Sequence, residues 1–267
     1  MQIPRLHLFE IHEQPWFPNS IRDGVTDGLF TVWKLMFWKN TLPHLQDLLK
    51  HSKGNRLLDL CSGAGGPLPL AVESLRNEIP NLSVVLSDIN PHCSWKSNTA
   101  DTPIEYHPNP VNAMSVPTDL GDARTLFEAF HHFRPKAATA ILSDAVKANK
   151  PIAVFEFQRR QLFDSLMPPM PYVLLVSSLL SWLHTPFRWS KLLATLFPII
   201  PFVLTFDGIV STFRTYTPKE LAEMARSAGT EGYHWEVRQT KDRGFGRMTC
   251  LIGWPAEVGG VSIVEYG

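Results

Sequence analysis

In the stretch LLDLCSGAGGPLPLAVESL, residues 57–75, a short apolar run is followed by a turn with three glycines and then by a segment of helical pattern. Residues 56–60 fit a buried strand, and residues 67–79 place apolar side chains at helical spacing behind an early proline. Glycines let such a turn be sharp and let a ligand approach the backbone closely. The stretch therefore predicts a strand, a ligand-binding turn and a helix in succession.

Strand-like and helix-like segments alternate along much of the remaining chain. Strands or extended segments are expected at residues 82–89, 104–117, 125–133, 151–157, 233–240 and 248–254, and helices at residues 91–100, 134–150 and 217–229. The last of these helices begins with the capping-box pair Thr217 and Glu220. The alternation predicts an α/β fold, with a doubly wound, Rossmann-like sheet that is mostly parallel, an antiparallel last strand, and helices on both faces.

Composition narrows the class of protein. The chain has 267 residues, 44% of them hydrophobic, and its 25 Lys and Arg balance its 25 Asp and Glu. A globular protein is expected, and nucleic acid is not expected as a partner, because the chain has no excess of positive charge. The three cysteines lie far apart, which argues against a disulfide framework or a zinc site, so no metal is expected. The first residues lack the apolar core of an export signal, which favours a cytoplasmic protein.

Two carboxylates follow neighbouring strands of the predicted sheet. Asp59 ends the first strand, and Asp88 ends the next, about twenty residues after the glycines. Ligands of doubly wound sheets bind at the carboxyl ends of the strands, and a carboxylate after the second strand suits the two hydroxyls of a ribose. A dinucleotide fingerprint is not present, because Leu68 occupies the place of its third glycine. The turn predicts a nucleoside ligand.

A carboxylate four residues before the first glycine resembles motif I of the class I S-adenosylmethionine-dependent methyltransferases, over roughly residues 56–157. The resemblance implies the methyltransferase form of the doubly wound sheet and S-adenosyl-L-methionine as cofactor. It puts Asp59 at the amino acid end of the cofactor, Asp88 at the ribose and Asn112 near the adenine, although many members have a carboxylate at the last position. The implied cofactor-binding residues are Asp59, Gly63, Ala64, Gly65, Asp88, Ile89, Asn112, Ala113 and Phe130. Ser62 replaces a glycine that many members carry.

Three residues are candidates for catalysis. His131 and His132 stand at the expected end of the fourth strand, and either imidazole could take a proton from the acceptor, since histidine titrates near neutral pH. The alternative is that they pack beside the cofactor. Glu156 ends the next strand and is either a general base or a buried partner of Arg124 or Arg159.

Two regions outside the expected sheet are rich in apolar and aromatic residues. Residues 1–50 are expected to form an amino-terminal helical cap, and residues 159–212 a hydrophobic helical insertion within a single domain of residues 1–267. Residues 165–187 and 192–206 contain no Asp, Glu, Lys or Arg, but their prolines favour a lid or an interfacial segment over a membrane-spanning pair. Ordinary helix packing is the alternative to an aromatic-walled acceptor site. The acceptor-binding candidates are Trp16, Phe17, Trp33, Trp182, Arg214 and Tyr216.

These features predict an enzyme that transfers a methyl group from S-adenosylmethionine to a hydrophobic small molecule or lipid. Two alternatives stay open. One is a membrane-associated methyltransferase whose insertion enters the lipid interface, with peripheral membrane contact. The other is a protein that binds a nucleoside without catalysis.

Overall fold

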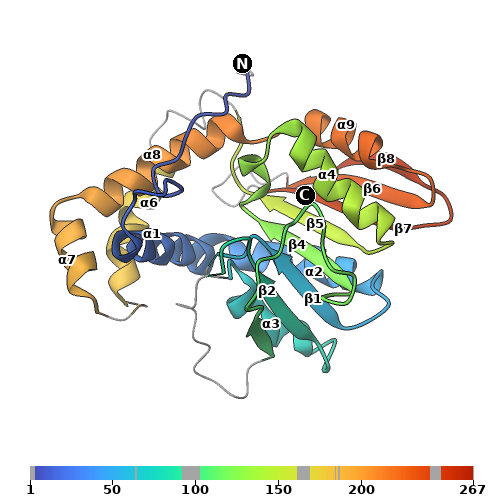
Figure 1. Ribbon diagram of the computed structural model, residues 1–267, viewed down its shortest axis with the longest axis horizontal. Helices are drawn as coiled ribbons and strands as arrows, with labels where there is room; N and C mark the ends of the chain where they lie inside the picture. The colour runs from blue at the N-terminus through green and yellow to red at the C-terminus, as the bar shows by residue number, and fades with distance from the viewer. Residues whose placement is uncertain are drawn as a thin grey trace. The chain divides into compact units, whose positions relative to one another are not determined.

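The computed structural model describes residues 4–63, 65–91, 103–160, 169–183, 185, 187–240 and 248–266 (Figure 1). The chain forms two compact units, each built from two segments. We call residues 1–37 and 158–216 the helical unit, and residues 38–157 and 217–267 the sheet unit. Ala64 and nearly all of the helix expected at 91–100 lie outside the described residues.

The sheet unit is built on one eight-stranded sheet with the order β3-β2-β1-β4-β5-β7-β6-β8. Its strands are β1 (Arg56–Leu60), β2 (Ser83–Ser87), β3 (Ile104–Tyr106), β4 (Ala123–Phe127), β5 (Ile152–Glu156), β6 (Tyr233–Thr240), β7 (Thr249–Pro255) and β8 (Gly260–Tyr266). β7 runs antiparallel to β5 and β6, and the other pairs of neighbouring strands are parallel. The predicted doubly wound, mostly parallel sheet is confirmed.

The carboxyl-terminal end of the sheet differs from the expectation in one respect. The predicted antiparallel strand is β7, but β8 follows it and pairs parallel with the outer side of β6. β8 is not among the strands that the sequence pattern predicts. Residues 260–264 of β8 are half-buried or exposed, unlike the residues of the central strands. A strand in such a position does not need the continuous apolar run that marks a strand buried on both faces.

Helices cover both faces of this sheet. They are α2 (Trp38–Lys50), α3 (Leu68–Arg76), α4 (Pro135–Lys147) and α9 (Pro218–Ala228). α4 packs against α9 and α2 against α3, and the two pairs lie on opposite faces (Figure 1). The predicted capping box opens α9, because the Thr217 hydroxyl accepts a hydrogen bond from the Glu220 N–H at 3.3 Å and the Glu220 carboxylate accepts one from the Thr217 N–H at 2.8 Å.

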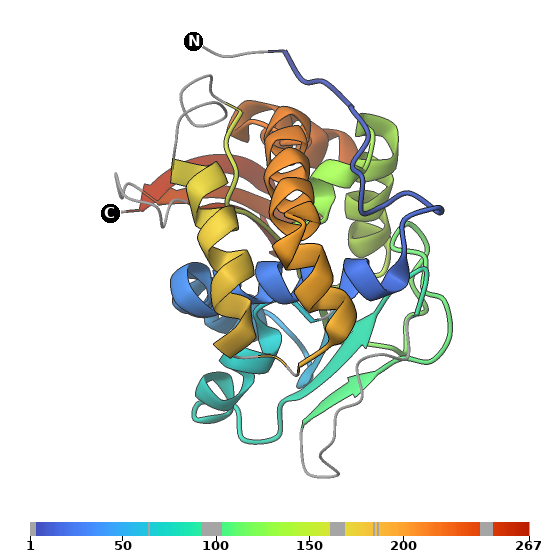
Figure 2. The ribbon, with the colours of Figure 1, turned by 90° about the vertical axis from the view of Figure 1, so that its left-hand side faces the viewer.

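The helical unit contains α1 (Asn19–Val32), the π-helix η1 (Trp33–Phe37), α6 (Pro169–Leu180), the 3₁₀ turn η3 (Ser181–Leu183), α7 (Trp189–Leu196) and α8 (Ile199–Arg214). α6 and α8 run side by side (Figure 2). Two glycines allow α1 to lie close to α8. A Cβ on Gly24 would come within 2.4 Å of Ile200 Cδ1, and one on Gly28 within 2.5 Å of Leu204 Cδ1.

The segment before α1 is fixed to α8 by buried polar groups. The Asp207 carboxylate accepts hydrogen bonds from the backbone N–H groups of Ile11 and His12, at 2.7 and 3.0 Å, and lies 2.8 Å from His12 Nδ1. Burial opposes protonation of His12, but the hydrogen bond to Asp207 and the charge of Glu10 outweigh it and raise the His12 pKa. The amino-terminal segment is thereby part of the helical unit.

The boundaries of the units cut the expected cap in two. Residues 1–37 belong to the helical unit, whereas α2 belongs to the sheet unit. The expected insertion, residues 159–212, falls inside the second segment of the helical unit, and its role as a lid stays a prediction. Within the described part of the chain, no single helix has both the length and the hydropathy to cross a bilayer, but α7 and α8 together meet those criteria across a bend of 73°.

Candidate functional site

The turn after β1 has an unusual backbone. Cys61, Gly63, Gly65 and Gly66 all have positive φ, with values of 56°, 50°, 92° and 51°. The φ of Gly65 favours glycine, and a Cβ there would lie only 3.0 Å from Leu86 Cδ1, so the Leu86 side chain would have to shift. A Cβ on Gly63 would have no described atom within 4 Å. The turn therefore closes tightly onto the sheet at Gly65 and leaves open space at Gly63.

Asp59 lies beneath this turn and is 1% exposed. Its Oδ1 accepts a hydrogen bond from the Thr125 hydroxyl at 2.8 Å, and its carbonyl accepts from the Ser62 and Ser87 hydroxyls at 2.9 and 2.7 Å. Burial raises the Asp59 pKa to about 7, and the nearby charge of Asp88 adds to this, while hydrogen bonds oppose it. The carboxylate is thus a buried acid that titrates near neutral pH.

Asp88 links the glycine turn to the neighbouring strand. Its carboxylate accepts hydrogen bonds from the backbone N–H groups of Gly63, at 3.2 Å, and Asn90, at 2.9 Å. Its carbonyl accepts one from the Val111 N–H at 2.9 Å, which brings the segment containing Asn112 to the same edge of the sheet. The half-buried Asp88 side chain can still reach a ligand, because a carboxylate has lone pairs for more than two donors.

The remaining cofactor candidates of the sheet unit differ in exposure. Asn112 is exposed, and its side-chain oxygen accepts a hydrogen bond from the Met114 N–H at 3.0 Å. Ala113 and Phe130 are buried, whereas Ile89 is 52% exposed. Ala64 lies outside the described residues.

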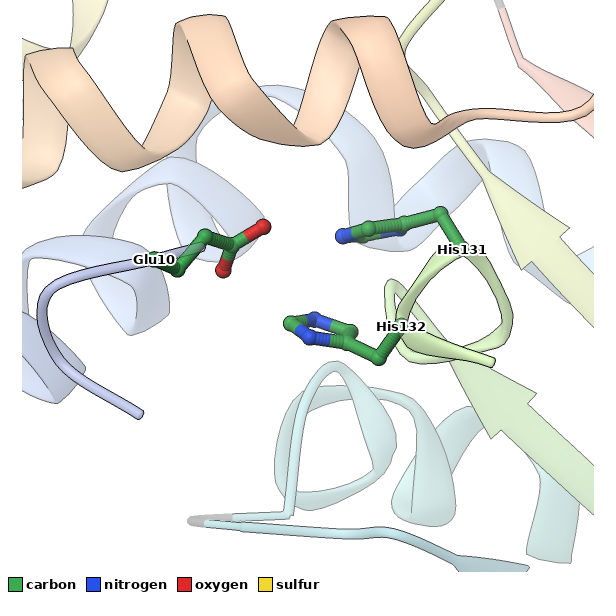
Figure 3. Close-up of side chains that lie close together, drawn as sticks. All are labelled: Glu10, His131 and His132. Atoms are coloured by element: carbon green, nitrogen blue, oxygen red, sulfur yellow. The ribbon is translucent and has the colours of Figure 1, made fainter. Parts of the chain in front are cut away.

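His131 and Glu156 form a buried pair. Glu156 Oε2 lies 2.6 Å from His131 Nδ1, and Oε1 accepts a hydrogen bond from the His131 N–H at 3.1 Å. Figure 3 shows the imidazoles of His131 and His132 extending to the same side of the turn, and their ring centroids are 4.2 Å apart. Glu10, also drawn in that figure, belongs to the helical unit. The pairing fixes the orientation of the His131 ring through Nδ1.

Two expectations about this pair need correction. The histidines do not stand at the end of a strand, because β4 ends at Phe127, Glu128 has a φ of 50°, and both histidines lie in the 3₁₀ turn η2 (Phe130–His132). Arg124 is also not the partner of Glu156, since Arg124 Nη1 lies 2.7 Å from Asp144 Oδ2.

The six acceptor-binding candidates all belong to the helical unit. Phe17, Trp33, Arg214 and Tyr216 are buried, Trp182 is half-buried, and Trp16 is 67% exposed. Arg214 Nη1 lies 3.2 Å from Glu10 and 3.1 Å from Glu13. The guanidinium of Arg5 lies 4.0 Å from the centroid of the Tyr216 ring. Arg214 therefore has internal partners that account for its charge.

The hydroxyl groups that hold Asp59 are not predicted from the sequence. The pattern predicts Thr125 and Ser87 only as members of buried strands, and Ser62 only as a departure from the family pattern. The available signal was a hydroxyl side chain within a buried apolar strand, on two strands that flank β1. Buried polar groups need partners, so such residues mark the neighbourhood of another buried polar group.

The chain matches no protein-family model and no curated protein. Similar solved structures include the S-adenosylmethionine-dependent methyltransferase SibL in its apo form, at 16% identity and a TM-score of 0.46, covering 82% of this chain and 55% of that one. Human N-acetylserotonin methyltransferase in complex with SAM is 14% identical, with a TM-score of 0.41 and coverage of 89% and 66%. The O-methyltransferase NcsB1 from neocarzinostatin biosynthesis, in complex with SAM and 2-hydroxy-5-methyl naphthoic acid, is 13% identical, with a TM-score of 0.49 and coverage of 89% and 58%.

This chain spans 55–66% of the length of those three structures. Identities this low and TM-scores below 0.5 carry no activity or substrate over to it. The strand order, the antiparallel strand beside β5 and the glycine turn after β1 are properties of the chain itself. They give it the fold of the class I S-adenosylmethionine-dependent methyltransferases, as the sequence resemblance predicts.

Proposed function

We propose that the sheet unit binds S-adenosylmethionine and transfers its methyl group to a small-molecule acceptor. The observation that carries the proposal is the arrangement of Asp59, Gly63 and Asp88 at the carboxyl ends of β1 and β2. A buried acid, an open glycine position and a half-buried carboxylate lie within one hydrogen-bonded turn. This is the edge of a doubly wound sheet at which ligands bind.

The residues of the turn fit the cofactor in three respects. The open space at Gly63 admits a ligand against the backbone. Asp88 can accept hydrogen bonds from ribose hydroxyls while the Gly63 N–H holds it in place. An ionised Asp59 carboxylate would attract a cationic group of the cofactor electrostatically. At 1% exposure the side chain offers little surface for direct contact.

S-adenosylmethionine, held by Asp59, Gly63 and Asp88, would supply a methyl group on a positively charged sulfonium, which is a good leaving group for attack by a nucleophilic acceptor. We assign His131 as the base that takes the proton of an acceptor hydroxyl or amine on Nε2. Glu156 holds Nδ1–H and stabilises the imidazolium that results. The turn η2 follows β4, and Glu156 ends β5, so both residues lie at the same sheet edge as the glycine turn.

The acceptor class we propose is a hydrophobic small molecule or lipid. Support comes from the composition of the chain, which is 44% hydrophobic and 11% aromatic. A non-catalytic nucleoside-binding protein is the second candidate, because the glycine turn alone would serve binding.

The test is transfer of a labelled methyl group to a panel of lipophilic acceptors. His131→Gln is expected to lower turnover by about a hundredfold while calorimetric affinity for S-adenosylmethionine stays within about twofold, because the base is lost and the turn is intact. Glu156→Gln should have a smaller effect and shift the pH profile of turnover. His132→Gln serves as the matched control.

Three results would count against these assignments. No binding of S-adenosylmethionine at millimolar concentration would reject the cofactor. Binding without transfer to any acceptor would favour the nucleoside-binding alternative. A loss of turnover confined to His132→Gln would move the base from His131 to its neighbour.

A further inference from the structure

Helix α7 buries its charged residue and exposes its apolar residues, which is the opposite of an ordinary surface helix. Lys191, its only charged residue, is 0% exposed. Trp189, Leu193 and Leu196 recur at helical spacing and are 71%, 54% and 69% exposed. A surface helix normally turns its apolar stripe to the core and its charges to water. α7 therefore presents an apolar stripe outward.

The inward position of Lys191 is well supported by partners. Its ammonium lies 2.9 Å from Asp27 Oδ2 and 2.6 Å from the Thr185 hydroxyl, and 4.9 Å from the centroid of the Trp182 ring. Arg188, just before α7, also binds Asp27. The charges of this segment are thus neutralised within the helical unit, so α7 is held with its apolar stripe exposed.

Further exposed apolar side chains lie on the elements that precede and follow α7 in the sequence. The apolar patch, as we define it, has side chains that are 54–74% exposed and comprises Leu183, Trp189, Leu193, Leu196, Phe197 and Phe202. They come from η3, α7, the bend after it and α8. Soluble proteins rarely leave so many large apolar side chains together in water without a partner.

The chemistry of the patch favours lipid over protein as that partner. Residues 192–206 contain no Asp, Glu, Lys or Arg, and the six patch side chains offer a single hydrogen-bonding group, the Trp189 indole N–H. Protein interfaces surround their apolar centre with polar contacts, about one hydrogen bond per 100–200 Å². Hydrocarbon requires only the absence of charge, and exposed Trp and Phe are typical at the boundary between headgroups and acyl chains.

The geometry favours shallow insertion over crossing. α7 has 8 residues and α8 has 16, so they are about 12 and 24 Å long at 1.5 Å per residue. Each is shorter than the ~30 Å hydrocarbon core of a bilayer, and the two are bent by 73° relative to each other. Such a corner can lie in the interface with its apolar side chains in the upper acyl region.

We propose that the apolar patch docks the protein on a lipid bilayer by shallow insertion, and that docking does not require anionic lipid. The second part follows because Lys191, the only cation of α7, is buried against Asp27, and Arg188, just before the helix, is paired with Asp23 and Asp27. The inference is independent of the proposed methyl transfer.

The test is co-sedimentation of the full chain with phosphatidylcholine vesicles, with and without phosphatidylserine, at low and high salt. The protein should bind both kinds of vesicle with affinities within about threefold of each other. Leu196→Glu should weaken binding by about tenfold or more, because a carboxylate would enter the apolar interface. Val258→Glu is the matched control, because Val258 is 83% exposed in the sheet unit and the charge change is the same.

Calorimetry with S-adenosylmethionine tests whether the Leu196→Glu chain is folded, because this variant should keep wild-type cofactor affinity if the cofactor assignment is right. If that assignment is wrong, circular dichroism provides the folding control instead. Absence of vesicle binding, or binding only to phosphatidylserine vesicles, would overturn the proposal. Self-association without lipid that Leu196→Glu abolishes would also overturn it and assign the patch to a second copy of the chain.

Discussion

Asp59 and Lys191 are both buried charges, but their surroundings differ. Asp59 is held by hydroxyl groups, and its described hydrogen bonds include no cation, so burial raises its pKa to about 7. Lys191 has a carboxylate partner inside its own unit, Asp27 at 2.9 Å. A buried charge with an internal counter-ion serves the fold, whereas one without it is available to a ligand of opposite charge. The contrast separates the cofactor site from the docking helix.

The largest effect should come from removing the internal counter-ion. Asp27→Ala leaves Lys191 buried and unpaired, which should cost about 3–5 kcal/mol of stability. Asp23→Ala is the control, because the half-exposed Asp23 carboxylate lies 3.6 Å from Arg188 and its loss should cost less than about 1 kcal/mol. Hydrogen exchange in α1 and α7 measures both. Equal protection in the two variants would mean that Lys191 does not depend on Asp27.

The glycine turn should be the next most sensitive feature. Gly65→Val combines a φ of 92° with a Cβ 3.0 Å from Leu86, so we expect cofactor affinity to fall by about a hundredfold. Gly63→Ala should also weaken binding, but less than Gly65→Val, because its single methyl group meets no described protein atom within 4 Å and enters only the open space assigned to the ligand. Calorimetry compares the two. Wild-type affinity in a folded Gly65→Val variant would remove this turn from the site.

Asp59 should make cofactor affinity depend on pH. Below about pH 7 the carboxyl is neutral and no longer attracts a cation, so affinity should fall by up to about tenfold per pH unit as the pH is lowered. Asp59→Asn should flatten this dependence. Stability of the free protein should change in the opposite direction, because a folded pKa above the ordinary 3.8 penalises the folded state at high pH and the penalty is lost as pH falls from 7 toward 4. A pH-independent affinity in the unmodified protein would contradict the contrast with Lys191.

Local patterns explain how far the fold could be predicted from the sequence. β1, β5 and β6 are apolar or alternating runs bounded by turn residues, and the capping box of α9 is defined by two residues three apart. β8 could not be predicted, because its half-exposed residues give no strong periodic signal. The end of β4 was misplaced because the left-handed backbone of Glu128 ends the strand without a glycine to mark it.

The candidate site could also be predicted only in part. Asp59 and Asp88 could be placed at one edge because the carboxyl ends of parallel strands meet there. The partner of Glu156 could not be predicted, because His131 lies in η2 and Arg124 on β4. Only three-dimensional packing selects between them. The exposure of Trp189 could not be predicted from the sequence pattern either, because helical spacing does not reveal which face of an apolar helix is covered.

The interruption of the sheet unit by residues 158–216 sets the order in which its strands can assemble on the ribosome. β5 pairs on one side with β4 but on the other with β7, which ends only at Pro255. At 5–20 residues per second, roughly 5–20 s of synthesis separate the two strands. During that interval the second segment of the helical unit is synthesised, and the nascent chain carries β5, an apolar run that ends in Glu156, with one edge unpaired. We expect chaperones that recognise extended apolar chain to bind β5 during this time, and slow translation after Glu156 to increase misfolding.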